Sequence, residues 1–168
     1  MSVALSADGN TAIVGGPGDN PWARSVPFGL GAAGAAWVFT RSAGVWTQQG
    51  NKLVSTDAVG RQGTSVALSA DGNIAILGGF SDDGGVALVF ARNGGHWTRD
   101  KNLVGTGAVG KSAPSVASAD DSTIMVGRSN DNGGVAAASM FTRSGDGSDS
   151  QEPPRPSVPS NQAVSLEE

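Results

Sequence analysis

The sequence predicts an all-β fold built from tandem units of four short antiparallel strands. Residues 2–16 (SVALSADGNTAIVGG) and 65–79 (SVALSADGNIAILGG) are identical at 13 of 15 positions, and residues 115–128 form a weaker third copy. Each of the first two copies contains an Asp-Gly turn between β-forming runs, which is a strong hairpin signal. Glycine is abundant, with 26 residues, and only 15% of residues are charged. Repetition at roughly 50 residues indicates a propeller or a linear array.

The second copy shows the four expected strands most clearly. Residues 64–69 alternate apolar and small polar side chains, and residues 70–73 (ADGN) turn the chain into the apolar run 74–78. After a loop, residues 86–92 (VALVFAR) are rich in β-formers, and a further turn leads to residues 96–99, which residues 102–104 are expected to extend.

The first and third copies vary this plan. The first carries an insertion, residues 17–34, in its second loop. The third has lost its Asp-Gly turn, and we expect no fourth strand after Arg143. Residues 144–168 are polar and proline-rich, so we expect a disordered tail. The predicted organisation is therefore three repeats (approximately 1–64, 65–114 and 115–143) followed by that tail.

Four antiparallel strands per unit match one blade of a β-propeller. The chain supplies two full blades and a degraded third, an incomplete ring, whereas propellers have about four to eight blades. Three alternatives remain open: homo-oligomerisation that closes a ring, membership of a larger propeller, or an open array with apolar ends.

The order of strands, turns and glycines over residues 1–143 resembles the FG-GAP repeat, the blade unit of integrin α-subunit heads and many bacterial surface proteins. Gly15-Gly16-Pro17 is the best match to the Gly-Ala-Pro triplet of that family, and Gln62-Gly63 stands near its Phe-Gly position. The resemblance implies a secreted or cell-surface protein with a protein or glycan partner. Residues 1–10 lack the basic and apolar pattern of a signal peptide, so we expect none within this sequence.

FG-GAP blades often carry a calcium loop between the first two strands, and this sequence departs from it. Only Asp8 and Asp71 stand there, each in a tight turn, whereas calcium takes six to eight oxygen ligands. We therefore do not carry calcium binding over to these turns, and we expect no cofactor.

Composition narrows the function classes further. A net charge of −4 argues against general nucleic-acid binding, which needs a basic surface. The absence of cysteine excludes disulfides and thiolate chemistry, and no apolar run is long enough to span a membrane.

Three tryptophans are the candidate ligand contacts. Trp46 and Trp97 occupy the same place in their repeats, where a ring could stack on a sugar but more often packs between sheets. Trp22 lies in the insertion without a repeat counterpart, which is typical of a contact residue on a loop.

Acidic residues follow the second strand of each repeat and are the only metal candidates. They are Asp19, Asp82, Asp83 and Asp131. A cation site is one interpretation, but Asx and Gly residues are also what turns require, and we favour the turn.

Two further features have structural interpretations. Arg41, Arg92 and Arg143 recur after the third strand's Phe. A basic ring for an acidic ligand is one interpretation, but we favour outward strand residues that limit edge pairing or bridge a carboxylate of a neighbouring blade. His96 is the only histidine and lacks triad or metal partners in the sequence.

The sequence thus predicts a non-enzymatic binding or adhesion scaffold that presents the loops of a propeller rim to a protein or glycan partner. An oligomeric lectin holding sugar between blades is the main alternative. A hydrolase or lyase on a propeller rim and a remnant reading frame without its own function are the others.

Overall fold

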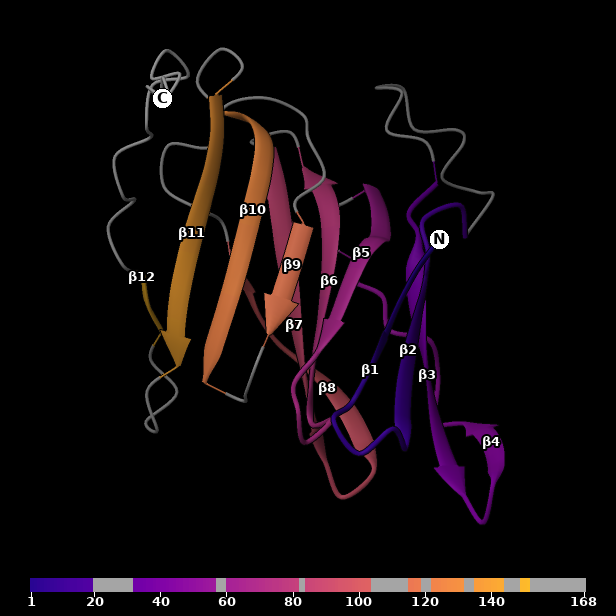
Figure 1. Ribbon diagram of the computed structural model, residues 1–168. Coiled ribbons are helices and arrows are strands. Elements are labelled where there is room, and N and C mark those ends of the chain that lie inside the picture. Colours follow the sequence, from indigo (N-terminus) through magenta and orange to yellow (C-terminus); the bar gives the residue numbers. More distant parts are fainter. Residues whose placement is uncertain are drawn as a thin grey trace, which may run out of the picture.

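A computed structural model describes residues 1–19, 32–56, 60–81, 84–103, 115–118, 122–131, 135–143 and 149–151. These residues form twelve strands and no helix, arranged in three antiparallel sheets of four strands each (Figure 1). None of the described residues belongs to a helix that is long and apolar enough to cross a membrane.

The first sheet contains the strands of the first repeat in chain order. It is made of β1 (Ser2–Leu5), β2 (Thr11–Gly16), β3 (Ala35–Ser42) and β4 (Val45–Gln48). The predicted hairpin between β1 and β2 is present, and it pairs Leu5 with Ala12.

The second sheet repeats this order with longer strands. It is made of β5 (Gly60–Leu68), β6 (Ile74–Ser81), β7 (Gly84–Asn93) and β8 (His96–Leu103). The expected extension of the fourth strand is confirmed as far as Leu103. β5 begins four residues earlier than the alternating pattern predicted, and its register shifts between Gly60 and Ser65.

The third sheet corrects one expectation. It contains β9 (Ser115–Ser118), β10 (Thr123–Asp131), β11 (Val135–Arg143) and a short fourth strand, β12 (Asp149–Gln151). The prediction that no strand follows Arg143 was wrong, because backbone pairing to β11 needs no apolar side chain. Apart from β12, the predicted disordered tail, residues 144–168, lies outside the described residues.

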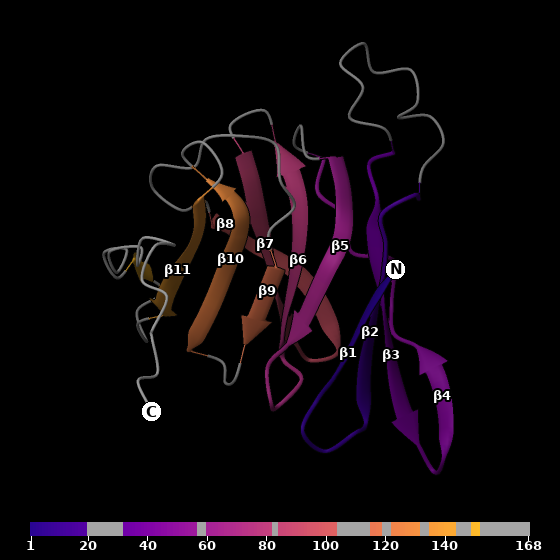
Figure 2. The ribbon, with the colours of Figure 1, turned by 45° about the horizontal axis from the view of Figure 1, so that its top comes forward.

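The three sheets stand side by side, with β5 of the second sheet facing β1 and β2 on one side and β9 on the other (Figures 1 and 2). Apolar side chains fill both spaces between them. Ile13 and Val38 of the first sheet meet Leu77 and Leu88 of the second in one core cluster. A second cluster joins the other face of the second sheet to the third sheet. The fold is all-β with three propeller-type blades of four strands each, and the fourth strand of the third blade has only three residues.

A segment between β4 and β5 ties the first two sheets together. Leu53 exchanges two backbone hydrogen bonds with Ala36 of β3, and Gln62 forms a parallel bridge with Gly34. The fully buried Gln62 side chain accepts a hydrogen bond from the Ser55 amide at 2.6 Å and donates one to the Ser55 carbonyl at 2.8 Å. The connection between the blades is therefore part of the core.

Candidate functional site

The two Asp-Gly turns have one hydrogen-bonding arrangement. At the first turn, Asp8 Oδ1 accepts hydrogen bonds from Ser6 Oγ at 2.5 Å and from the Asn10 amide at 2.9 Å. Asp8 Oδ2 accepts one from Asn10 Nδ2 at 3.1 Å. Ser69, Asp71 and Asn73 repeat the arrangement in the second sheet. Both carboxylates therefore organise the backbone of their own turn.

The pKa values of these two carboxyl groups reflect the same contacts. The Ser6 hydroxyl, followed by the donors of Asn10, holds the pKa of Asp8 below 3.8. Burial raises the pKa of Asp71, but hydrogen bonds from Ser69 and Asn73 and the charge of Arg92 outweigh it, so the net shift is also downward from 3.8. Both groups are held in the charged form that accepts these hydrogen bonds.

The acidic loop residues are placed only in part. Asp19 forms an ion pair with Lys52, which brings the second loop of the first sheet to the segment between β4 and β5. Asp82 and Asp83 lie outside the described residues, as does the side chain of Asp131. Within the described ranges, no three His, Cys, Asp or Glu side chains gather as a metal would require.

Trp97 lies between the first and second sheets. It packs against the first apolar cluster, and its indole Nε1 donates a hydrogen bond at 3.0 Å to Oε1 of Gln49, the residue that follows β4. The guanidinium of Arg92 lies over its ring, 5.5 Å from the centroid. This is the placement that the packing interpretation predicted, and a ligand-binding role for Trp97 stays a prediction.

Arg92 connects the same two sheets. Its Nε donates to Asn73 Oδ1 at 3.0 Å within its own sheet, and its Nη1 donates across to Gln49 Oε1 at 3.3 Å and Thr11 Oγ1 at 3.5 Å. The bridge to a neighbouring blade is present, although its acceptors are an amide and a hydroxyl group where we expected a carboxylate. Arg41 is exposed, and the side chain of Arg143 is outside the described residues.

The other tryptophans are in different surroundings. Trp46 is 42% exposed on β4, where it pairs with Arg41. Trp37 is half-buried on β3, opposite Val14 of β2. Trp22 lies outside the described residues. Of the two candidate tryptophans that the structure describes, Trp97 lines the contact between sheets and Trp46 does not, so they do not form one site.

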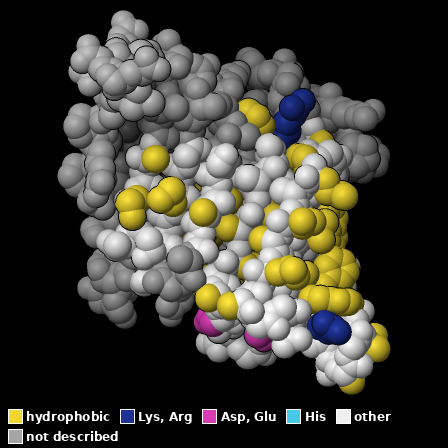
Figure 3. All heavy atoms as spheres, in the orientation of Figure 1, with side chains coloured by type: hydrophobic (Ala, Val, Ile, Leu, Met, Phe, Trp, Pro, Cys, Tyr) yellow, Lys and Arg dark blue, Asp and Glu magenta, His cyan; other side chains and the backbone are white. Residues whose placement is uncertain are grey.

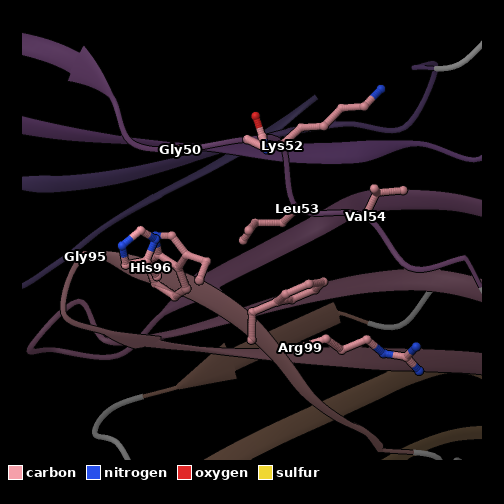
Figure 4. A pocket seen from close by; sticks show the side chains of 10 residues that line it. Gly50, Lys52, Leu53, Val54, Gly95, His96 and Arg99 are labelled. Carbon is pink, nitrogen blue, oxygen red and sulfur yellow. The ribbon is translucent and has the colours of Figure 1, made fainter.

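A groove of about 510 Å³ opens between the segment that follows β4 and the strands β7 and β8. In Figure 4, Lys52, Leu53 and Val54 come from the segment that follows β4, and His96 and Arg99 come from β8. Phe90 and Trp97 add aromatic lining, and Asn51 adds an amide. Sequence reasoning missed this groove, because residues 50–54 carry no motif and meet β8 only after the sheets pack.

Two of its charged side chains are held by neighbours. Lys52 is fixed by its ion pair with Asp19, and Arg99 Nη2 donates to Asn102 Oδ1 at 2.8 Å. The groove thus combines an apolar floor with polar and cationic walls. Such a mixture suits reversible binding of a ligand that has an apolar surface and a few polar or anionic groups.

No protein-family model matches the chain, and no curated protein matches it. Among solved structures, the chain is similar to the crystal structure of TolB from Acinetobacter baumannii, with a TM-score of 0.48 and 10% identity. The similarity covers 90% of this chain and 31% of the TolB chain. The assignment of propeller-type blades rests on the strand order and sheet packing described above.

Proposed function

We propose that this chain is a non-enzymatic binding scaffold that holds a protein or glycan partner in the groove between its first and second blades. The observation that carries the proposal is the groove itself. Its volume of about 510 Å³ falls within the range of ligand sites, roughly 300–1,000 Å³. Leu53 and Phe90 supply apolar contact, while Asn51 and His96 supply hydrogen-bonding groups.

The charge of the walls favours an anionic partner. Lys52 and Arg99 are both cationic, and the groove lining includes no carboxylate. Asp19 neutralises part of the charge of Lys52 from outside that lining. We therefore propose a partner that presents a carboxylate, either an acidic side chain in an extended protein segment or an acidic sugar.

The resemblance to the FG-GAP repeat supports a secreted or cell-surface location and an adhesion role. In this proposal the blades are a structural frame. The turns at Asp8 and Asp71 support a structural role, because each carboxylate accepts a hydrogen bond from the backbone of its own turn.

An oligomeric lectin that binds sugar between its blades is the second candidate, and the position of the groove favours it. The groove lies between two blades, where sugar binding was expected for an oligomeric lectin, and Trp97 contributes to its lining. Trp97 is half-buried and its N–H is engaged by Gln49, so a sugar would meet the exposed part of its ring.

One experiment tests both candidates. A glycan array and a display library of acidic peptides are probed with the wild-type chain, with His96→Ala and with Val45→Ala. Val45 is the repeat counterpart of His96, and its side chain is 63% exposed outside the groove. We expect His96→Ala to weaken binding of the selected ligand by about tenfold, the loss of roughly one hydrogen bond, and Val45→Ala to leave it unchanged.

The controls separate the proposal from a general surface effect. Binding should weaken as salt is raised, because partly exposed charges are screened. Absence of any ligand in both libraries, or equal binding by wild type and His96→Ala, would contradict the groove as the binding site.

A further inference from the structure

One face of the first sheet is apolar and has no neighbouring sheet among the described residues. The strand registers place seven apolar side chains that are exposed or half-buried on this face, which we call the first-sheet face. They are Val3, Leu5, Ala12, Val14, Trp37, Phe39 and Trp46. Val3 is 70% exposed and Leu5 is 62% exposed, although such side chains are usually buried in soluble proteins. In Figure 3, hydrophobic side chains gather along the side of the molecule formed by β1, β2 and β3.

The repeat shows what this kind of face does when a neighbour is present. The counterparts of Val3, Leu5 and Phe39 in the second sheet are Val66, Leu68 and Phe90, which are only 8%, 5% and 4% exposed. These counterparts pack against the opposite face of the first sheet, which carries Ala4, Ile13, Ala36 and Val38. The first-sheet face therefore presents the surface that buries itself on a neighbouring blade elsewhere in the same chain.

The third sheet presents the matching surface at the other end. Ala117, Met125, Ala138 and Met140 share the face of this sheet that meets no other sheet among the described residues. They occupy the register positions of Ala4, Ile13, Ala36 and Val38. We call this the third-sheet face. Met125 is 44% exposed, and its unbranched side chain can adapt to an irregular partner surface. One chain thus exposes, at its two ends, the two kinds of surface that pack together between its first and second sheets.

The polar residues at the edge of the contact between the first and second sheets also have counterparts on the two exposed faces. In the internal contact, Arg92 of the second sheet reaches Thr11 of the first sheet. Arg41 is the counterpart of Arg92. The backbone N–H of Arg41 donates a hydrogen bond of 2.8 Å to the Asn10 carbonyl, and the N–H of Arg92 donates an equivalent one of 2.8 Å to the Asn73 carbonyl. Thr123, which pairs with Thr142, stands in the third sheet where Thr11 pairs with Thr40 in the first.

We propose that the first-sheet face of one copy packs on the third-sheet face of a second copy, in the geometry of the internal contact between the first and second sheets. Arg41 of one copy then reaches Thr123 of the other. The interface is head-to-tail, so it either closes into a ring or continues as a filament. Each copy has three sheets, so two copies make a six-bladed ring, within the range of about four to eight blades that propellers use, and three copies exceed it.

The test is the mass in solution of the full 168-residue chain. Light scattering during size-exclusion chromatography is carried out on wild type, Leu5→Asp and Met125→Asp, with circular dichroism to check folding. A charge at either position is buried unpaired in the interface but lies on the surface of a monomer. We expect wild type to have the mass of two copies and each variant to have half that mass. Val45→Asp, another exposed apolar position but outside both faces, should remain a dimer.

Mixing the variants distinguishes head-to-tail contact from contact between like faces. Leu5→Asp keeps a native third-sheet face, and Met125→Asp keeps a native first-sheet face, so the mixture should form a dimer through one intact contact. A second pair, Val3→Asp with Ala117→Asp, repeats the test if a variant fails to fold. A folded wild-type monomer, dimerisation of Met125→Asp alone, or failure of two folded variants to associate when mixed would overturn the proposal.

Discussion

Substitution of Gln62 by Met tests whether the connection between the first two blades is part of the folding core. Gln62 is 0% exposed, and its amide holds both the N–H and the C=O of Ser55, itself only 4% exposed. Met has a similar length and volume, so the substitution removes hydrogen-bonding groups without opening a large cavity.

The cost follows from the two backbone groups that lose this partner. Loss of a buried hydrogen-bond partner costs about 1–3 kcal/mol for each group, and burial of the apolar Met side chain returns part of it. We expect the free energy of unfolding to fall by about 2–4 kcal/mol, a large share of the roughly 5–15 kcal/mol of a typical domain.

Urea denaturation followed by tryptophan fluorescence measures this change. With a slope of about 1–3 kcal/mol per molar urea, the midpoint should fall by roughly 1–2 M. Gln48→Met is the matched control, because Gln48 is exposed and donates its hydrogen bond to Gly50 at the surface, so its effect should stay below about 0.5 kcal/mol. Equal stability of Gln62→Met and Gln48→Met would refute the reasoning.

Three further predictions use the same assay. Gly63→Ala should cost more than about 2 kcal/mol, because φ is +79° and a Cβ atom would lie 2.4 Å from the Ala35 carbonyl oxygen, whereas Gly94→Ala, at φ +56° with open space, should cost about 1 kcal/mol. Trp97→Phe and Gln49→Leu should each cost about 1 kcal/mol, and their effects should be non-additive in a double-mutant cycle, since both remove the same hydrogen bond; additive effects would contradict that bond. The lowered pKa of Asp71 contributes stability above about pH 3.8 that is lost as the pH falls through the folded-state value, so Asp71→Asn should be less stable than wild type at pH 7 and should converge on it as the pH falls below the folded-state pKa; a constant difference would contradict it.

The local features of the fold could be predicted because they depend on residues close in sequence. The Asp-Gly hairpins follow from turn chemistry within five residues, and the side chains of Asp8 and Asp71 satisfy the turn itself. The alternation of apolar and polar residues located the strands, because it too depends only on residues close in sequence. β12 was missed because its residues, Asp149–Gln151, have no β-forming side chains and pair only through the backbone.

The partners of side chains that cross from one sheet to another could not be predicted, although a bridge by Arg92 to a neighbouring blade and the packing of Trp97 between sheets were expected. Arg92 and Gln49 are 43 positions apart, and their hydrogen bond exists only because β7 and the end of the first sheet are brought together. The groove has the same origin, since Lys52 and Arg99 come from different repeats. The sequence does not indicate that Gln62 is buried, because its hydrogen-bond partner is the backbone amide of Ser55, seven residues away.

Trp46 and Trp97 show how far the function of a repeat residue depends on its neighbours. The two occupy equivalent positions, yet Trp97 is half-buried between sheets while Trp46 is 42% exposed. If copies associate head to tail, Trp46 becomes an interface residue, as Trp97 is internally, and its role as a ligand contact is excluded by burial. A Trp46→Ala variant that stays dimeric but loses glycan binding would therefore favour the ligand role, whereas loss of the dimer would assign Trp46 to the contact between blades.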